Sequence, residues 1–208
     1  MKLQVAFDDI SLNGINSILE KSISNIDIVE FGTLSVIRYG LSYLNTIKEK
    51  YPNCVLLVDP KIMDAPKKIA EDCFKNKADI VTVMSVAGIE TVKKVIEVAN
   101  KYNKEVMVDL LGEKDIENTI SSLNDLDIDY ICVHSSKNEN VPPLQDFIKA
   151  KSLIKNAKIA LAGGINLDNL PSIVKENPDV VIIGSMIYES EDPKTTIERI
   201  KEQIQWII

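Results

Sequence analysis

Short runs of β-branched and other apolar residues recur along the whole chain, separated by mixed segments. Eight such runs are candidate strands, at residues 3–8, 26–31, 54–59, 79–84, 105–111, 129–134, 158–164 and 179–185. The segments between them show the period of an amphipathic helix, as in the apolar positions Ile89, Val92, Val95, Ile96 and Ala99. Strands that alternate with helices predict a parallel sheet, because each strand needs a crossover to return beside its neighbour.

The last interval predicts a helix that completes an eighth unit. Asp192 is placed to cap it, Pro193 suits the first helical position, and an apolar stripe follows at Ile197, Ile200, Ile204 and Ile207. Eight units without a linker or low-complexity tract predict a single domain over residues 1–208, a small (β/α)8 TIM barrel. The rival, a doubly wound open sheet, should carry a glycine-rich phosphate loop after the first strand, but that segment reads DDISLNG.

Charge and composition narrow the function. The 208 residues include 24 Lys and Arg against 31 Asp and Glu, a net charge of −7. A chain like this without a basic run lacks the footprint of a nucleic-acid binder. No segment approaches the roughly 18 apolar residues of a membrane span, and MKLQVAFDD has no signal-peptide core, so we expect a cytoplasmic protein without a membrane partner. Cys54, Cys73 and Cys132 are far apart and form no CxxC, which predicts buried, unpaired side chains.

Ionisable side chains stand at the carboxyl ends of several predicted strands. Strand alternation puts Asp8 on the same face as Gln4 and Ala6. The same parity places five more groups on the matching face of other strands: Glu30, Asp59, Lys61, Asp109 and His134. The C-terminal rim of a (β/α)8 barrel is where active sites lie, so we expect these six side chains to converge on a catalytic site.

Each carboxylate also has a purely structural interpretation, because an acid that ends a strand can cap the next helix or face water. This applies most to Asp8 and Asp109, although the neighbouring Asp9 is the better candidate for a helix cap. Four carboxylates beside one lysine and the only histidine of the chain leave uncompensated negative charge. A hard divalent cation would balance it, so the pattern predicts a Mg²⁺ site.

Two glycine-containing strand ends predict a phosphate site. Gly163 and Gly164 follow the seventh predicted strand, and Gly184 and Ser185 end the eighth. Loops after these two strands often bind phosphate through backbone N–H groups in such barrels, and glycine permits the close approach. The alternative is that these glycines only permit tight turns. Together the features favour a phosphorylated sugar substrate and proton chemistry beside a metal.

Residues 59–64, DPKIMD, form a D-x-K-x-x-D motif, and with it the chain resembles the orotidine 5′-monophosphate decarboxylase suprafamily. The resemblance covers nearly the whole chain through further segments in order: MKLQVAFD, IDIVEFGT, ADIVTV, VDL, CVH, ALAGGI and VVIIGSMIY followed by DP. Within the suprafamily, the chain resembles the 3-hexulose-6-phosphate synthases more closely than the 3-keto-L-gulonate-6-phosphate decarboxylases. The resemblance implies a ribulose-phosphate binding barrel.

The resemblance also implies roles for individual residues. Glu30 and Asp59 match the carboxylates linked to Mg²⁺, Lys61 matches the lysine that stabilises an enediolate, and His134 matches the acid/base histidine. Asp8 matches the acid that ends the first strand, and Asp64 matches an acid that reaches into the partner's site in a homodimer with shared active sites. From the residues alone, Asp64 is also a candidate N-cap for the next helix, and both roles can coexist.

The implied activity is an aldolase reaction that joins formaldehyde to D-ribulose 5-phosphate, giving D-arabino-hex-3-ulose 6-phosphate, or the reverse, through a Mg²⁺-stabilised enediolate. Four features favour this reaction over keto-gulonate phosphate decarboxylation: Asp109, the segment Ser135-Ser136-Lys137, Ala162 and Ser185. The decarboxylase remains the enzymatic alternative. A third possibility is a silent barrel that only binds a sugar phosphate, although silence should have erased one of the matched residues and none is erased.

Overall fold

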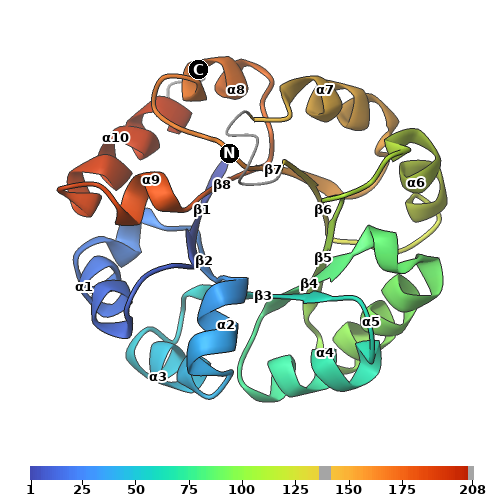
Figure 1. Cartoon of the computed structure of the whole chain (residues 1–208), viewed down its shortest axis with the longest axis horizontal. Coiled ribbons are helices and arrows are strands. Elements are labelled where there is room, and N and C mark those ends of the chain that lie inside the picture. The colour runs from blue at the N-terminus through green and yellow to red at the C-terminus, as the bar shows by residue number, and fades with distance from the viewer. Residues whose placement is uncertain (136–141, 206–208) are drawn as a thin grey trace.

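The computed structural model describes residues 1–135 and 142–205. Its eight strands close into one parallel barrel, in which each strand pairs with its neighbours in chain order and β8 returns to β1 (Figure 1). The strands are β1 Lys2–Phe7, β2 Ile28–Phe31, β3 Val55–Ile62, β4 Ile80–Met84, β5 Glu105–Asp109, β6 Tyr130–His134, β7 Lys158–Ala162 and β8 Val180–Ile183. Every predicted run contains a strand, and the (β/α)8 fold is confirmed.

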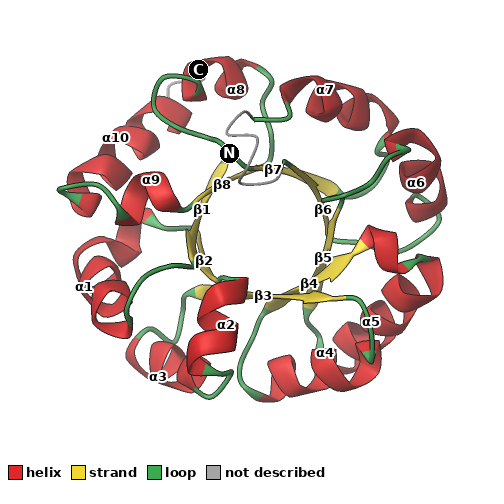
Figure 2. Cartoon of the chain, in the orientation of Figure 1, coloured by secondary structure: helices red, strands yellow, loops and turns green. Residues whose placement is uncertain are grey.

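Helices surround this ring of strands as an outer layer (Figure 2). They are α1 Leu12–Ser22, α2 Thr33–Tyr39, α3 Tyr43–Lys50, α4 Pro66–Lys75, α5 Ile89–Tyr102, α6 Ile116–Leu123, α7 Leu144–Leu153, α8 Leu170–Lys175, α9 Ser185–Tyr188 and α10 Pro193–Gln205, with 3-10 turns η1 Ile23–Asn25 and η2 Ser85–Ala87. Two helices follow β2 and two follow β8. None of the described helices has the length and apolar content of a membrane-spanning segment.

Strand alternation divides the buried residues into two layers. In β1, Val5 and Phe7 pack between the barrel and the helices, whereas Gln4 and Ala6 point into the barrel. The interior apolar core is formed by Ile28, Leu57, Ile80, Met107, Tyr130, Cys132, Ala160, Ala162 and Val180. The polar residues that were predicted to share one face at the strand ends are therefore on the interior face of the barrel.

Four aspartates fasten the N-terminal ends of the strands in pairs. Each directly precedes an even-numbered strand, and its Oδ2 accepts a hydrogen bond from a backbone N–H of the odd-numbered strand before it. The pairs are Asp27 with Leu3 (2.7 Å), Asp79 with Leu56 (2.9 Å), Asp129 with Val106 (2.8 Å) and Asp179 with Ile159 (2.8 Å). Three predicted runs began one residue early for this reason, because their first residue caps a neighbouring strand with its side chain.

The helix expected after residue 192 is α10. Asp192 caps it as predicted, with Oδ1 accepting hydrogen bonds from the backbone N–H groups of Lys194 at 3.2 Å and Thr195 at 3.4 Å. Three residues of the predicted apolar stripe are buried: Ile197, Ile200 and Ile204. The fourth, Ile207, lies outside the described residues.

Two other predicted caps were wrong. Ser11, not Asp9, caps α1 through a hydrogen bond that its Oγ accepts, and Asp9 pairs with Arg38 instead. Residue Ala65 stands at the start of α4 without a side-chain cap, and Asp64 only accepts a hydrogen bond from the adjacent N–H of Ala65. Both caps were predicted from residue type alone. In the structure Asp9 lies two residues before the N-cap of α1, and Asp64 lies one residue before the N-cap of α4.

Candidate active site

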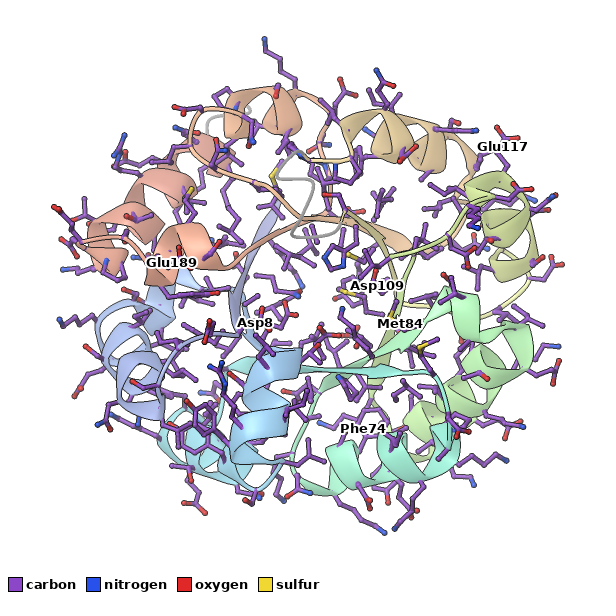
Figure 3. All side chains as sticks on the ribbon, viewed as in Figure 1. Asp8, Phe74, Met84, Asp109, Glu117 and Glu189 are labelled. Atoms are coloured by element: carbon purple, nitrogen blue, oxygen red, sulfur yellow. The ribbon has the colours of Figure 1, made fainter. Side chains whose placement is uncertain are left out.

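A cavity of about 360 Å³ opens at the carboxyl ends of the strands. Figure 3 shows Asp8 and Asp109 on opposite sides of this opening, inside the strand ring. The cavity is lined by ten of the predicted site residues: Asp8, Glu30, Asp59, Lys61, Asp109, His134, Gly163, Gly164, Gly184 and Ser185. Asp64 is the exception, because it is exposed and lies outside the cavity.

An irregularity in β3 aims two charged side chains into the cavity. The pairing register between β3 and β4 shifts between Val58 and Ile62, and Lys61 has a left-handed backbone with φ 46°. Pro60 lacks an N–H and cannot donate to the ladder, which favours a bulge at this point. Simple alternation predicted the shared face of Asp59 and Lys61, but the strained backbone at Lys61 was not predicted. Strain of this kind often accompanies functional sites.

The ammonium group of Lys61 lies between two buried carboxylates. Its Nζ is 3.1 Å from Oδ2 of Asp59 and 3.3 Å from Oδ2 of Asp109. Burial by itself would lower the pKa of Lys61, but the charges of Asp59 and Asp109 outweigh burial and raise the pKa above its usual value. Lys61 is therefore a positive charge throughout the physiological pH range.

Asp109 also holds the imidazole of His134, at 2.9 Å between Oδ2 and Nδ1. Burial would raise the pKa of Asp109, but the hydrogen bond and charge of His134, with Lys61 and the N–H of Leu111, lower it below its ordinary value. An ionised carboxylate has no proton to donate, so Nδ1 of His134 is the donor. In the neutral imidazole the lone pair is then on Nε2, the nitrogen left for proton transfer.

Glu30 and Asp59 form the carboxylate side of the site. Asp59 accepts hydrogen bonds from the hydroxyls of Thr33 at 2.7 Å and Thr82 at 2.5 Å, and Glu30 Oε2 accepts one from Nε2 of Gln4 at 2.6 Å. Burial, followed by the charges of Asp59 and Asp8, raises the pKa of Glu30 to about 8. Among the residues that line the described cavity, four are carboxylates and one is a lysine. Oxygen donors with excess negative charge are what a hard divalent cation requires.

A second group of donor atoms lies beside this one. Asp109, Cys132 and His134 each offer an atom within 4.8 Å of the others. Burial, and after it the charge of Asp109, raises the pKa of the Cys132 thiol well above its usual value, so the sulfur is protonated. The hydrogen bond between Asp109 and His134 already uses two of the donors, which makes this group less suited to a cation than Glu30 and Asp59. Cys73 is buried as predicted, and Cys54 is half-buried.

The predicted phosphate-binding glycines have conformations that other residues rarely adopt. Gly163 and Gly164 have φ values of 95° and 61°, and a Cβ on Gly163 would collide with Ser135. A Cβ on Gly184 would lie 3.0 Å from the carbonyl oxygen of Ala6. Turn geometry and packing therefore account for part of the glycine requirement. Phosphate binding by these loops, with Ser185 at the start of α9, stays a prediction.

A model of the orotidine 5′-phosphate decarboxylase / HUMPS family matches residues 1–200. The chain belongs to this family. It is 36% identical over 207 residues to a Bacillus subtilis protein named 3-hexulose-6-phosphate synthase, covering 98% of this chain and 99% of that protein. The crystal structure of 3-hexulose-6-phosphate synthase from Salmonella typhimurium is similar with a TM-score of 0.95, 33% identity and 99% coverage of both chains.

The fold is shared with a further solved enzyme structure. The structure of 3-keto-L-gulonate-6-phosphate decarboxylase from Vibrio cholerae has a TM-score of 0.82 at 23% identity, covering 98% of this chain and 97% of that one. At that identity the similarity concerns the fold alone. The named relatives are lyases, and the chain is a lyase of the same family.

Three of the four features that favoured the synthase branch of the family fall within the described residues. Asp109 and Ala162 are buried and line the cavity, and Ser185 lines it at the end of β8. Ser135 also lines the cavity, whereas Ser136 and Lys137, like residues 138–141 of the sixth loop, lie outside the described part of the chain.

Sequence reasoning missed two hydroxyl groups of the site. Thr33 begins α2 and Thr82 lies in β4, and both donate to Asp59. Thr82 had a detectable feature, because a polar residue within an otherwise apolar strand run is unusual unless it is hydrogen-bonded inside. Thr33 directly follows Gly32, where a Cβ would collide with the carboxylate of Asp8, so this corner is tightly packed.

Proposed function

We propose that the chain is an aldolase that condenses formaldehyde with D-ribulose 5-phosphate to D-arabino-hex-3-ulose 6-phosphate, or catalyses the reverse. The observation that carries this proposal is the shared carboxylate: Oδ2 of Asp109 contacts both Nζ of Lys61 and Nδ1 of His134. A base and a fixed positive charge on one carboxylate are what proton removal beside a carbonyl requires. The similarity to proteins named 3-hexulose-6-phosphate synthase supports this particular reaction.

His134 acts as the base in this proposal. Asp109 holds Nδ1 in its protonated form, so Nε2 accepts the proton from C1 of the pentulose phosphate. Proton removal places negative charge on the oxygens of the resulting enediolate, whose carbon then attacks formaldehyde. The new carbon–carbon bond leaves an alkoxide on the former formaldehyde oxygen, and His134 returns its proton to that oxygen.

Lys61 stabilises that negative charge as an ammonium ion. Its contacts with Asp59 and Asp109 raise its pKa, which keeps the amine protonated and therefore a poor nucleophile. A Schiff base between Lys61 and the substrate carbonyl would need the neutral amine. The charge environment thus favours electrostatic stabilisation over covalent catalysis.

Glu30 and Asp59 are the proposed ligands of a divalent cation, Mg²⁺. Both are buried carboxylates in a cavity with excess negative charge, and burial, followed by the charges of Asp59 and Asp8, raises the pKa of Glu30. A cation bound there supplies Lewis-acid stabilisation of oxygen charge. The hydroxyls of Thr33 and Thr82 orient Asp59 for this role.

The sugar phosphate fits the remaining lining of the cavity. Backbone N–H groups and a hydroxyl are offered after β7 and β8 by Gly163, Gly164, Gly184 and Ser185, and only β1 separates β8 from β2, the strand of Glu30. Small side chains at Ala162 and Ser185 leave room for a second substrate, formaldehyde. Larger or more proton-donating groups would instead favour protonation of an enediolate, the final step of a decarboxylase.

We also propose that two copies share their active sites. Exposed apolar side chains follow the C-terminal ends of three neighbouring strands: Leu34 and Ile37 on α2, Met63 after β3 and Val86 in η2. Ile37 is 73% and Met63 54% exposed, and Leu34 also lines the cavity, so exposed apolar side chains gather near the site as they do at protein interfaces. Asp64 directly follows Met63 in the chain. If a second copy covers this surface, the carboxylate of Asp64 would face that copy's active site.

The test supplies purified protein with Mg²⁺, D-ribulose 5-phosphate and formaldehyde and follows the disappearance of formaldehyde. A parallel assay follows carbon dioxide release from 3-keto-L-gulonate 6-phosphate. We expect kcat/KM for condensation to exceed that for decarboxylation by at least ~10-fold, about 1.4 kcal/mol of discrimination. Equal or faster decarboxylation would place the protein in the other branch, and failure of both reactions would favour a silent sugar-phosphate-binding barrel. Full turnover after exhaustive chelation would show that the reaction does not require a divalent cation.

A further inference from the structure

Gln4 is a buried amide inside the barrel with only half of its hydrogen-bonding groups paired. Its side chain has no solvent exposure, and its Nε2 donates to Oε2 of Glu30 at 2.6 Å. The other end of the amide, Oε1, is buried and has no hydrogen-bond partner among the described residues. The side chain also lines the active-site cavity.

The surroundings of Gln4 would suit an apolar side chain. Its register partners on the two adjacent strands are Ile28 in β2 and Ile182 in β8. Ile28 belongs to the interior apolar core, and Ile182 packs against it. An amide that leaves an acceptor unpaired in such a place stabilises the fold less than an apolar side chain of the same size would. Stability alone therefore does not explain why glutamine stands here.

Among the described residues, the side chain of Gln4 hydrogen-bonds only to Glu30, a proposed cation ligand. Its hydrogen bond ends on Oε2 of Glu30, and no described residue donates a hydrogen bond to Oε1 of Glu30. Glu30 extends from β2 one pleat further toward the cavity than Ile28, the strand neighbour of Gln4. Gln4 is thus placed behind the carboxylate, on the side of the interior core, where it can fix the orientation of Glu30 without blocking its approach to a ligand.

We propose that Gln4 is a positioning residue for Glu30, holding one carboxylate oxygen so that the other is presented to a divalent cation shared with Asp59. This inference rests on the proposed function, because it requires the cation. Partners that hydrogen-bond a metal ligand orient it and tune its affinity, and their removal typically weakens binding by 10–100-fold. Gln4 makes no contact with the reacting atoms in this assignment.

The experiment measures Mn²⁺ binding to chelator-stripped, full-length protein by calorimetry, together with the thermal unfolding midpoint of the same metal-free samples. The test variant is Gln4→Met, which keeps the length of the side chain and removes both polar ends. The matched control is Gln203→Met on α10, because the Oε1 atom of Gln203 is also buried without a partner. Glu30→Gln removes the ligand itself and sets the baseline for lost binding.

We expect Gln4→Met to weaken Mn²⁺ binding 10–100-fold while its metal-free unfolding midpoint stays at or above that of the wild type. Gln203→Met should bind Mn²⁺ like the wild type. If Gln4→Met does not fold, Gln4→Asn retains the amide but is one methylene too short to reach Glu30, and the same loss of affinity is expected.

Three results would overturn the assignment. Wild-type Mn²⁺ affinity in Gln4→Met, with binding lost in Glu30→Gln, would refute the role of Gln4 and leave the proposed cation site standing. Equal affinity losses in Gln4→Met and Gln203→Met would mean general loosening of the barrel. Absence of Mn²⁺ binding in the wild type would remove the cation site of the proposed function together with this inference.

Discussion

The backbone N–H of Lys61 donates to Oγ1 of Thr82 at 3.3 Å, across the bulge between β3 and β4. The same hydroxyl donates to Oδ1 of Asp59 at 2.5 Å. One side chain therefore ties the left-handed residue Lys61 to the carboxylate two positions before it. This link replaces the ladder hydrogen bonds that the bulge interrupts, and it sets the distance between the lysine and a proposed cation ligand.

Removing that hydroxyl should impair catalysis with little effect on the fold. Thr82→Val keeps the shape of the side chain but leaves Asp59 and the Lys61 N–H without their shared partner. We expect kcat for condensation to fall by about 10-fold or more, because catalytic groups displaced by a fraction of an ångström lose alignment. Steady-state kinetics measures this, and Thr82→Ser, which retains the hydroxyl, should stay close to the wild type. A Thr82→Val variant with wild-type kcat would show that Lys61 and Asp59 keep their positions without the Thr82 hydroxyl.

The base assigned to His134 can be tested without formaldehyde. His134→Asn should suppress exchange of the C1 proton of D-ribulose 5-phosphate with deuterated solvent by at least ~100-fold, since a positioned base contributes about that factor. Asp109→Asn should also slow exchange, because an amide can donate to Nδ1 and no longer enforces the same tautomer. Proton NMR follows the exchange. Unimpaired exchange in His134→Asn would require a different base.

Glu30 predicts a pH dependence of stability in the metal-free protein. Its folded pKa of about 8 exceeds the ordinary 4.5, so the folded state binds the proton more tightly than the unfolded state. The resulting stabilisation is complete below pH 4.5 and is lost as the pH rises through 8, at up to about 1.4 kcal/mol per pH unit.

Glu30→Gln lacks this titration. In chelator, we expect the free energy of unfolding of the wild type to fall steadily relative to that of Glu30→Gln between pH 5 and pH 8, as measured by urea denaturation. Added Mg²⁺ should offset this relative loss of stability near pH 8, because it binds and stabilises only the wild type. Parallel pH profiles of the two proteins would mean that Glu30 is not perturbed in the folded state.

The regular parts of this molecule were predictable because they follow from periodicity. Alternation in β1 alone placed Asp8 and Gln4 inside and Val5 and Phe7 outside, and the structure agrees. The same rule applied to other strands brought together the charged side chains that line the cavity. Parity is a local property, so it needs no knowledge of the partner strands.

The unpredicted features depend on contacts between distant segments. The bulge at Lys61 includes Pro60 and is bridged by the hydroxyl of Thr82, which lies 21 residues from Lys61 in sequence. Asp9 looked like a helix cap by residue type, but the position of Arg38 on α2 gives it a better partner. Asp79 looked like the first residue of a strand, although its carboxylate closes the end of the neighbouring strand. Side-chain type suggests several such roles, and tertiary geometry selects one.

The aspartates at the N-terminal rim of the barrel should stabilise the fold without affecting catalysis. Asp79 accepts from the N–H of Leu56 and pairs with Lys48 and Lys104 at 2.5 and 2.6 Å. Burial would raise the pKa of Asp79, but the hydrogen bonds of Lys104 and Lys48 lower it. A lowered pKa stabilises the folded state above the unfolded value of 3.8, and this contribution is lost as the pH falls through the folded pKa.

Asp79→Asn should therefore lower the free energy of unfolding by roughly 2–3 kcal/mol at pH 7, since charge-assisted hydrogen bonds are lost and two lysines lose their partner. Asp129→Asn, at the equivalent position without a lysine hydrogen bond among the described residues, should lose about 1 kcal/mol. Chemical denaturation measures both, and kcat of the folded variants should match the wild type. Equal losses would show that the lysines contribute nothing.

The proposed sharing of active sites makes Asp64 testable by subunit mixing. Asp64 is exposed and lies outside the cavity of its own chain, whereas Lys61 lies inside it. Lys61→Ala and Asp64→Ala homodimers should each be inactive. In a mixed dimer, one of the two sites combines Lys61 of one chain with Asp64 of the other, so random reassociation should restore about a quarter of wild-type activity. Activity after unfolding and refolding the mixture, with verified mixed dimers, measures this. Verified mixed dimers without activity, or an active monomer by sizing, would mean that Asp64 does not act across the interface.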